Sequence, residues 1–324
     1  MRVVEVSEFG GPEVLQVADR PAPAPQPGQV RIRVGAAGVN FADVMTRLGR
    51  YPHANITPCV PGFEVAGEVV ECGPGVTTPA VGDRVAAVLR GGGYAEQVCV
   101  EHRDTVPLPD RLGLEEGAGL LITAATAWAG LRTYGNVQAG ERVLVMAAAG
   151  GVGTAALQIA RAAGAEVHGA ASSPKLGLVR SLGAHAHDYT TPGWEHDLPP
   201  FDLVMDAIGG DSFARSYALL RPGGRLVPFG AAATFATGDG DMRLIEGLST
   251  AELMVDSKVV VGLDLRVLWD DRGTLQPWLT PLRQPTADGT LTPVVAEAVP
   301  FAEAARAHRL LGTRATVGKV VLVP

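Results

Sequence analysis

The chain has 324 residues, of which 47% are hydrophobic, and a formal net charge of −7 at pH 7. This length is typical of about two domains, and the composition suffices for two packed cores. A pI near 5.5 argues against nucleic acid or an anionic membrane as a partner, because both attract proteins with a clustered basic face. Small neutral molecules are therefore the favoured ligands.

The N-terminus runs directly into strand-like sequence and lacks the basic stretch and apolar core of a signal peptide. No apolar run reaches the roughly 18 to 20 residues needed to span a bilayer. Cys59, Cys72 and Cys99 form no CxxC pair, and their odd number favours a reducing compartment over a disulfide framework. We expect a cytoplasmic protein without a membrane span or a structural zinc lobe.

From Val3 to Val106 the sequence indicates short strands separated by turns. Gly, Pro and Asp interrupt the apolar runs, as in Gly73-Pro74-Gly75. The pattern predicts a barrel-like antiparallel domain. Its predicted strands are Val3–Val6, Val14–Val17, Val30–Ala36, Val65–Cys72, Arg84–Val88 and Tyr94–Val100.

Helix-forming residues dominate from Leu114 to Thr133, and strands then alternate with helices. The alternation predicts a parallel βαβ domain. Its predicted strands are Arg142–Met146, Glu166–Ala170, Leu203–Asp206, Arg225–Phe229 and Val259–Gly262. Its predicted helices are Val152–Ala163, Pro174–Leu182 and Phe213–Leu220.

The tail predicts a return to the first domain. A helix begins near Arg266, and the chain then closes with strand Val294–Ala298, helix Phe301–Leu311 and strand Gly318–Val323. We therefore predict a split domain of residues 1–123 and 265–324, with the βαβ domain inserted as residues 124–264.

A glycine-rich turn follows the first strand of the βαβ domain. Glycines at such a turn let the backbone approach a pyrophosphate and place it at the positive end of a helix. In this context the turn predicts a dinucleotide site, although a merely tight turn is the alternative. Its residues are Gly150, Gly151, Val152 and Gly153.

The end of the second βαβ strand bears on the choice of cofactor. An NAD site carries Asp or Glu there to hold the ribose 2′-hydroxyl, but this chain has Ser172, Ser173 and Lys175. Small hydroxyls and a cation suit a 2′-phosphate, so we predict NADPH. For Lys175 the alternative is a solvated surface charge.

Six segments together resemble the zinc-independent quinone oxidoreductase (zeta-crystallin-like) branch of the medium-chain dehydrogenase/reductase superfamily. They are Ala37–Asp43, Arg47–Tyr51, Pro61–Gly67, Thr123–Trp128, Ala149–Gly153 and Gly318–Leu322. The resemblance implies an α/β chain with a Rossmann cofactor domain and a GroES-like β-barrel catalytic domain. It also implies a homodimer formed through the strand Val259–Gly262.

Two positions separate this chain from the zinc enzymes of that superfamily, which carry Cys at 40 and His at 63. Here these residues are Asn40 and Phe63. A catalytic zinc needs about three protein ligands, so no metal is expected. Glu64 persists, and an internal hydrogen bond or salt bridge is its expected role.

The same resemblance nominates Asn40, Tyr51 and Thr126 as catalytic, with Asn40 and Thr126 also contacting the cofactor. Asn40 would hydrogen-bond the cofactor or the substrate carbonyl and help stabilise developing negative charge. The alternatives are a turn-forming Asn, a packing aromatic and an ordinary helix Thr. Met45 replaces a second pocket tyrosine of the family, which suggests a more apolar pocket.

Further cofactor positions follow from the resemblance, with Tyr189 and Arg314 assigned to the 2′-phosphate. The remaining cofactor positions are Ile208, Gly230, Leu263, Gly318 and Lys319. The seven histidines show no ligand spacing along the chain and are expected to be solvated or structural.

The predicted activity is hydride transfer from NADPH to a small hydrophobic quinone. Positioning of the two reactants and exclusion of water would supply most of the catalysis. Two alternatives stay open. One is a reductase of conjugated enones or enoyl thioesters, and the other is a non-catalytic NADPH-binding protein like those of the vesicle-transport branch.

Overall fold

The computed structural model describes residues 1–51, 56–233, 248–313 and 316–324. The chain forms two compact units, a first unit of Met1–Thr123 with Thr274–Pro324 and a second unit of Ala124–Gly273. The first unit is thus built from both ends of the sequence. Its second segment begins at Thr274 rather than at residue 265, because helix α9 (Leu265–Arg272) belongs to the second unit.

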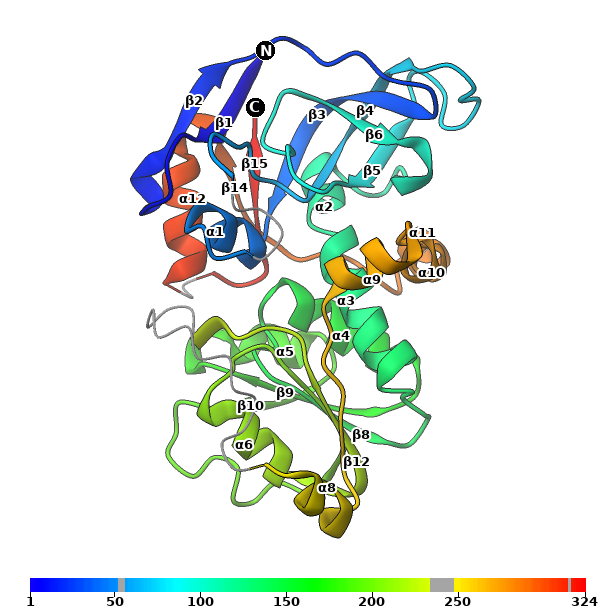
Figure 1. Cartoon of the computed structure of the whole chain (residues 1–324). Coiled ribbons are helices and arrows are strands. Elements are labelled where there is room, and N and C mark those ends of the chain that lie inside the picture. The colour runs from blue at the N-terminus through cyan, green and yellow to red at the C-terminus, as the bar shows by residue number, and fades with distance from the viewer. Residues whose placement is uncertain (52–55, 234–247, 314–315) are drawn as a thin grey trace. The chain divides into compact units, whose positions relative to one another are not determined.

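A mainly antiparallel sheet of seven strands forms the first unit (Figure 1). The strand order is β14-β15-β3-β4-β5-β7, and β6 also pairs with β3. The strands are β3 (Gln29–Val39), β4 (Glu64–Cys72), β5 (Arg84–Val88), β6 (Gln97–Glu101), β7 (Thr105–Pro107), β14 (Val295–Pro300) and β15 (Lys319–Val323). A separate hairpin pairs β1 (Arg2–Val6) with β2 (Leu15–Asp19).

The core of the first unit follows from alternation along its strands. On β3, Val30, Ile32 and Val34 are buried and the residues between them are less so, as expected for a half-buried strand. Strand β15 pairs with β3 in antiparallel register, with Val320 opposite Val39. This pairing places a late segment of the sequence between β14 and β3, inside the sheet.

Short helices complete the first unit. Asn40 is the N-cap of α1, and its backbone N–H donates to the Asp43 carboxylate at 2.7 Å, as in a capping box. The helices are α1 (Phe41–Arg47), α2 (Leu114–Ala118), α10 (Gln276–Leu279), α11 (Arg283–Asp288) and α12 (Ala304–Gly312).

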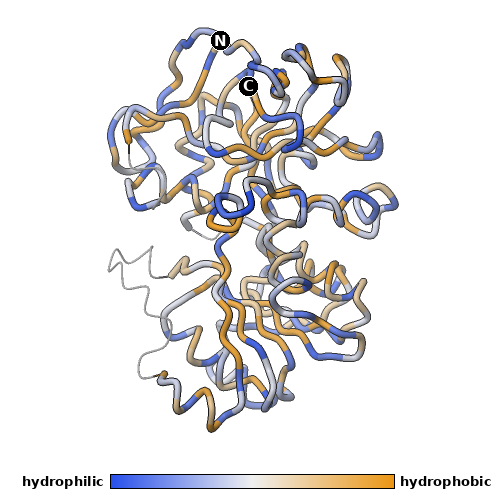
Figure 2. The backbone as a smooth tube through the Cα atoms, turned by 45° about the vertical axis from the view of Figure 1, so that its right-hand side comes forward, coloured by the Kyte–Doolittle hydropathy of each residue, from blue (hydrophilic) through white to orange (hydrophobic). Residues whose placement is uncertain are grey.

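The second unit contains a six-stranded parallel sheet in the order β10-β9-β8-β11-β12-β13. Hydrophobic residues follow its strands in Figure 2, as expected when both faces of a sheet are covered. The strands are β8 (Arg142–Val145), β9 (Glu166–Ala171), β10 (His185–Asp188), β11 (Phe201–Asp206), β12 (Leu220–Pro228) and β13 (Val259–Val260). The predicted α/β fold with two kinds of domain is confirmed.

Helices pack against this sheet in the expected alternation. Helix α4 lies against β8 and β9, α5 against β9 and β10, and α6 against β11 and β12. The helices are α3 (Leu121–Trp128), α4 (Gly151–Ala162), α5 (Leu176–Ser181), α6 (Asp211–Ala218), α8 (Thr250–Asp256) and α9. None of the helices described is long and apolar enough to cross a membrane.

Two local features go beyond the sequence analysis. The helix-forming stretch Leu114–Thr133 is divided into α2, α3 and a π-helical turn at Ala129–Tyr134, because α2 ends at the C-cap Gly119. Edge strand β10 was not predicted, because its sequence His-Ala-His-Asp has no apolar alternation.

A buried polar chain fixes helix α1 in the first unit. The Asp43 carboxylate accepts the Gly62 N–H at 2.7 Å and also bonds the Tyr94 hydroxyl. The Tyr94 hydroxyl lies 3.1 Å from Nε2 of His308 on α12. Burial raises the pKa of Asp43 to about 7, and burial lowers the pKa of His308 to about 3. His308 is therefore a neutral ring whose protonation opposes folding.

Acid should destabilise the protein through His308. Between pH 6.5 and about pH 3 the unfolded chain binds a proton at this residue that the folded chain does not, so the contribution of His308 to stability falls as pH falls, opposite in sign to that of Asp43. From pH 7 to pH 5 this loss is about 2 kcal/mol. His308→Leu should remove that part of the pH dependence, measured by urea unfolding at both pH values. Parallel curves for wild type and variant would contradict this origin.

Candidate functional site

A buried ion pair joins two segments that are distant in the sequence. Nζ of Lys319 lies 2.6 Å from Oε1 of Glu64, and the two side chains are 5% and 1% exposed. The same ammonium donates to Oδ1 of Asn40 at 2.5 Å, across a separation of 279 residues. Asn40 Nδ2 donates to Glu64 Oε1 at 3.0 Å, which closes a triangle of polar groups.

The ends of three strands position these polar groups, which we call the Asn40–Glu64–Lys319 cluster. Asn40 follows β3, Glu64 begins β4 and Lys319 begins β15, and these strands are neighbours in the sheet. The second carboxylate oxygen of Glu64 accepts the Ile122 N–H at 2.9 Å. Glu64 thus makes the internal ion pair expected of it.

The cluster changes the interpretation of two predicted residues. Lys319 was assigned to the cofactor, but its ammonium binds Glu64 and Asn40. The Asn40 side chain is also engaged at both of its polar ends, although one Nδ2 hydrogen is left beyond that given to Glu64. The Lys319 ammonium therefore contacts both Asn40 and Glu64. The two zinc ligands of the related enzymes, Cys at 40 and His at 63, are absent from this chain.

Aromatic packing accounts for the position of Tyr51. Its ring meets the Phe63 ring edge-on, with centroids 5.3 Å apart and planes at 60°. Phe63 is buried, and Met45 on α1 is buried as well. These contacts favour the packing alternative for the Tyr51 ring, and the residue adds a polar hydroxyl to an otherwise apolar group.

In the second unit, the predicted dinucleotide turn links β8 to the start of α4. Gly150 is the N-cap of α4, and its N–H donates to the Ala147 carbonyl at 3.0 Å. A Cβ on Gly153 would lie 2.7 Å from Cα of Ala148, so only glycine lets the helix begin this close to the strand end. The turn and the free N–H groups of the helix form a cradle suited to a pyrophosphate.

An acidic residue that sequence reasoning missed lies at the edge of this site. The Ser173 hydroxyl donates to the Asp188 carboxylate at the end of β10. Asp188 also accepts from Thr190, through N at 2.9 Å and Oγ1 at 2.6 Å. The Ser173 hydrogen bond, followed by those from Thr190, lowers the pKa of Asp188, which is therefore ionised near pH 7. This contact was missed because strand β10, which carries Asp188, was not predicted.

The other predicted cofactor residues of the second unit gather at strand ends. Ser172 precedes the short turn that carries Lys175, and the Tyr189 N–H donates to the last residue of β9. The positions that follow the carboxyl ends of β11, β12 and β13 are Ile208, Gly230 and Leu263. In parallel sheets ligands bind at this edge.

The predicted set is divided between the two units. Thr126 lies in the second unit on α3, whereas Asn40, Tyr51, Gly318 and Lys319 lie in the first. Gly318 lies just before β15, has a φ of +90° and packs closely against Val294. Both features require glycine for structural reasons. Arg314 lies outside the described residues.

Two family profiles match this chain. The alcohol dehydrogenase GroES-like domain matches residues 26–110, and the zinc-binding dehydrogenase domain matches residues 182–322. A solved quinone oxidoreductase from Thermus thermophilus, determined alone and with NADPH, is 36% identical with a TM-score of 0.85 and full coverage of both chains. The chain belongs to the zinc-independent, quinone-oxidoreductase-like branch of the medium-chain dehydrogenase/reductase superfamily.

Other relatives show how broad this superfamily is. The synaptic vesicle membrane protein VAT-1 homolog of Rattus norvegicus is 35% identical over 100% of this chain and 84% of its own length. A segment of the Streptomyces halstedii polyketide synthase GfsB, 5% of that protein, is 38% identical over 91% of this chain. Membership places the chain among the medium-chain oxidoreductases.

Proposed function

We propose that the protein is an NADPH-dependent reductase that transfers a hydride to a small hydrophobic quinone. The observation that carries this proposal is the glycine turn between β8 and α4, where a Cβ at Gly153 would clash with the backbone of Ala147 and Ala148, so that glycine lets α4 begin directly at the strand end. The relative from Thermus thermophilus, whose structure includes NADPH, supports the choice of cofactor.

The residues of the second unit fit this dinucleotide. Gly150 to Gly153 and the N-terminus of α4 would hold the pyrophosphate, and Ser172 and Lys175 would hold the 2′-phosphate. Tyr189 and Arg314 are proposed at the same phosphate. When bound, the cofactor supplies the hydride.

In the first unit, the Asn40–Glu64–Lys319 cluster would stabilise negative charge on the acceptor oxygen. Lys319 uses two of its three N–H donors inside the cluster, and Asn40 retains one Nδ2 hydrogen. Asn40 is half-buried, so its amide is the member that would contact the acceptor. Because the buried Lys319 ammonium holds the Asn40 side chain in place, the Asn40 amide need not reorient during the reaction. Tyr51 would supply a further hydrogen bond, and Thr126 would contact the cofactor.

The similarity to the solved CurK enoyl reductase, 30% identical with a TM-score of 0.87, supports one alternative acceptor, a conjugated enone or enoyl thioester. Reduction of either class uses the same hydride and the same stabilised oxygen. The similarity to the VAT-1 homolog keeps a third interpretation, a protein that binds NADPH without turnover.

NADPH oxidation by the purified protein against a panel of aromatic quinones and conjugated enones tests these interpretations. Turnover fastest with quinones would support the proposal, and turnover fastest with enones would favour the alternative. Tight binding with no turnover on any acceptor would favour the non-catalytic interpretation. Asn40→Ala should lower kcat/KM by about 10–1000-fold if its amide contacts the acceptor.

We also propose a homodimer formed through the edge of the parallel sheet. Strand β13 is the last strand of that sheet, so its outer hydrogen-bonding groups can pair with a second copy. Val259 on β13 is exposed, as are Met254 and Val255 on the adjacent helix α8. Light scattering should give twice the chain mass; a monomer at micromolar concentration would contradict the proposal.

Asp188→Asn should strengthen NADPH binding about 3–10-fold and leave NADH binding nearly unchanged. The carboxylate bonded to Ser173 repels a nearby 2′-phosphate, and asparagine keeps an acceptor for that hydroxyl. Fluorescence titration of both cofactors measures the change.

Asp288→Asn is the matched control, because Asp288 accepts the Thr290 N–H at 2.9 Å in the same kind of turn within the first unit. An equal effect of Asp188→Asn on both cofactors would place Asp188 away from the 2′-phosphate.

A further inference from the structure

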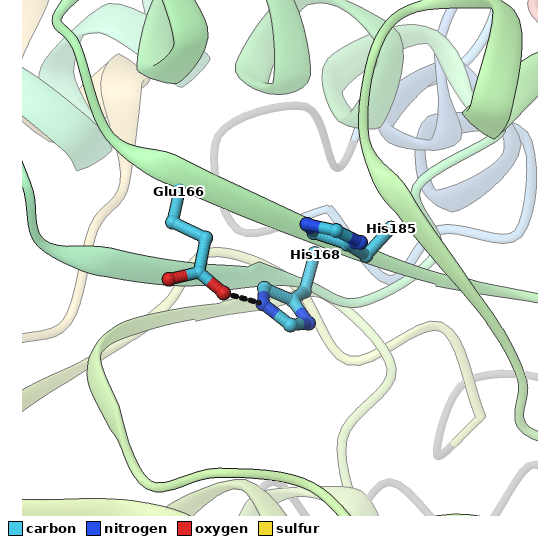
Figure 3. Close-up of side chains that lie close together, drawn as sticks. All are labelled: Glu166, His168 and His185. Atoms are coloured by element: carbon cyan, nitrogen blue, oxygen red, sulfur yellow. Dashed lines mark hydrogen bonds and ion pairs between the residues drawn. The ribbon is translucent and has the colours of Figure 1, made fainter.

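Four potential metal ligands lie on one face of the two outermost strands on one side of the parallel sheet. Glu166 and His168 alternate along β9, and His185 and His187 alternate along β10, so each pair points to one side. The parallel register places His185 beside His168. Figure 3 shows Glu166, His168 and His185 gathered in this way.

The distances within this group suit one bound ion. His168 Nε2 lies 3.0 Å from Glu166 Oε1, and one ligand atom from each of Glu166, His168 and His185 lies within 4.8 Å of the others. A tetrahedral zinc with ligands at about 2.0–2.2 Å needs them about 3.3–3.6 Å apart. Glu166 and His185 are exposed, so side-chain rotation can close the remaining gap.

The neighbouring groups provide the outer contacts that metal ligands have in proteins. Nδ1 of His168 lies 2.9 Å from Nε2 of His187, a partner that fixes the ring and directs Nε2 toward the ion. Arg142 Nε bonds the other Glu166 oxygen at 3.1 Å, which orients that carboxylate. The Phe201 ring packs against His168 at 5.0 Å and supports the buried side of the group.

We propose that Glu166, His168 and His185 bind one divalent transition-metal ion, most suitably Zn²⁺. Two imidazoles and a carboxylate form the mixed nitrogen and oxygen ligand set that this ion prefers, with a fourth position left for water. The ion would tie edge strand β10 to β9.

This site is separate from the proposed cofactor site. Glu166 begins β9 and Ser172 follows its end, a separation of about 20 Å along an extended strand. The proposal therefore replaces the expectation that the protein binds no metal, and it leaves the argument from Asn40 and Phe63 unchanged. The linear spacing of the histidines concealed the site because its members meet across two strands.

Zinc binding to untagged, chelator-treated protein tests the proposal, by calorimetry and by the shift in Tm. We expect one Zn²⁺ per chain, a rise in Tm, and binding at least tenfold weaker in His185→Asn and in Glu166→Gln. Both residues are exposed, so the variants should fold, which circular dichroism without metal will verify. His102→Asn, an exposed histidine of the first unit, is the control and should bind like wild type.

Cobalt provides an independent readout, because a tetrahedral Co²⁺ site absorbs visible light strongly. The band should appear with wild type and His102→Asn and be absent with His185→Asn. Equal zinc affinity in all the variants, or no binding at micromolar zinc, would overturn the proposal.

Discussion

Lys319→Met is expected to lower the free energy of unfolding by about 3–5 kcal/mol, the largest single effect on stability that we predict. The substitution removes the cation from a buried carboxylate, since Lys319 and Glu64 are 5% and 1% exposed. It also leaves Oδ1 of Asn40 without the donor that lies 2.5 Å away. Urea unfolding of the purified variant measures the loss.

Two further variants identify the cause of that loss. Arg33→Met removes an exposed ion pair with Glu68 between β3 and β4 of the same sheet, and should change stability by no more than about 1 kcal/mol. Glu64→Gln combined with Lys319→Met should recover part of the loss, because no unpaired charge then remains buried. If Lys319→Met cost no more than Arg33→Met, the ion pair would not be a main stabilising contact.

Gly153→Ala is expected to weaken NADPH binding at least tenfold and to destabilise the protein by about 1–3 kcal/mol. The added methyl group would lie 2.7 Å from Cα of Ala148, which is backbone and cannot rotate away. The start of α4 must then move away from the strand end, and its N–H groups move with it. Cofactor titration and thermal unfolding measure the two effects.

Gly177→Ala is the matched control in the same unit. Gly177 lies in helix α5, and a Cβ there would meet nothing within 4 Å. Alanine should therefore leave NADPH binding unchanged and stabilise the helix by up to about 1 kcal/mol. Unaltered cofactor affinity in Gly153→Ala would remove this turn from the dinucleotide site.

The sequence predicted those parts of the fold that depend on local pattern. Strands β3 and β9 were predicted because their apolar residues match the periodicity of a strand or form a short buried run. The glycine turn was predicted because the close approach of the helix to the strand end requires glycine, and three glycines stand within four neighbouring positions. In each case the physical cause lies within a few residues along the chain.

Contacts between distant segments could not be predicted in this way. Nothing near Asn40 indicates that Lys319, 279 residues later, supplies its partner, because that contact depends on β15 pairing with β3. Asp188 and the histidines of β10 were missed for the same reason. Their contacts form only when β10 pairs with β9, and the polar sequence of β10 does not predict a strand. In both units, the pairing of distant strands brings the site residues together.

The insertion of β15 between β14 and β3 has a consequence for biosynthesis. Residues 124–273 emerge from the ribosome before β14 and β15 do, so the parallel sheet can form while the other sheet still lacks two strands. Until then the Ala37–Val39 end of β3 lacks its β15 partner, and Lys319 is not yet beside Glu64. A nascent chain stalled with residues up to Val294 outside the ribosome should therefore carry a folded second unit and an incomplete first unit that chaperones can recognise.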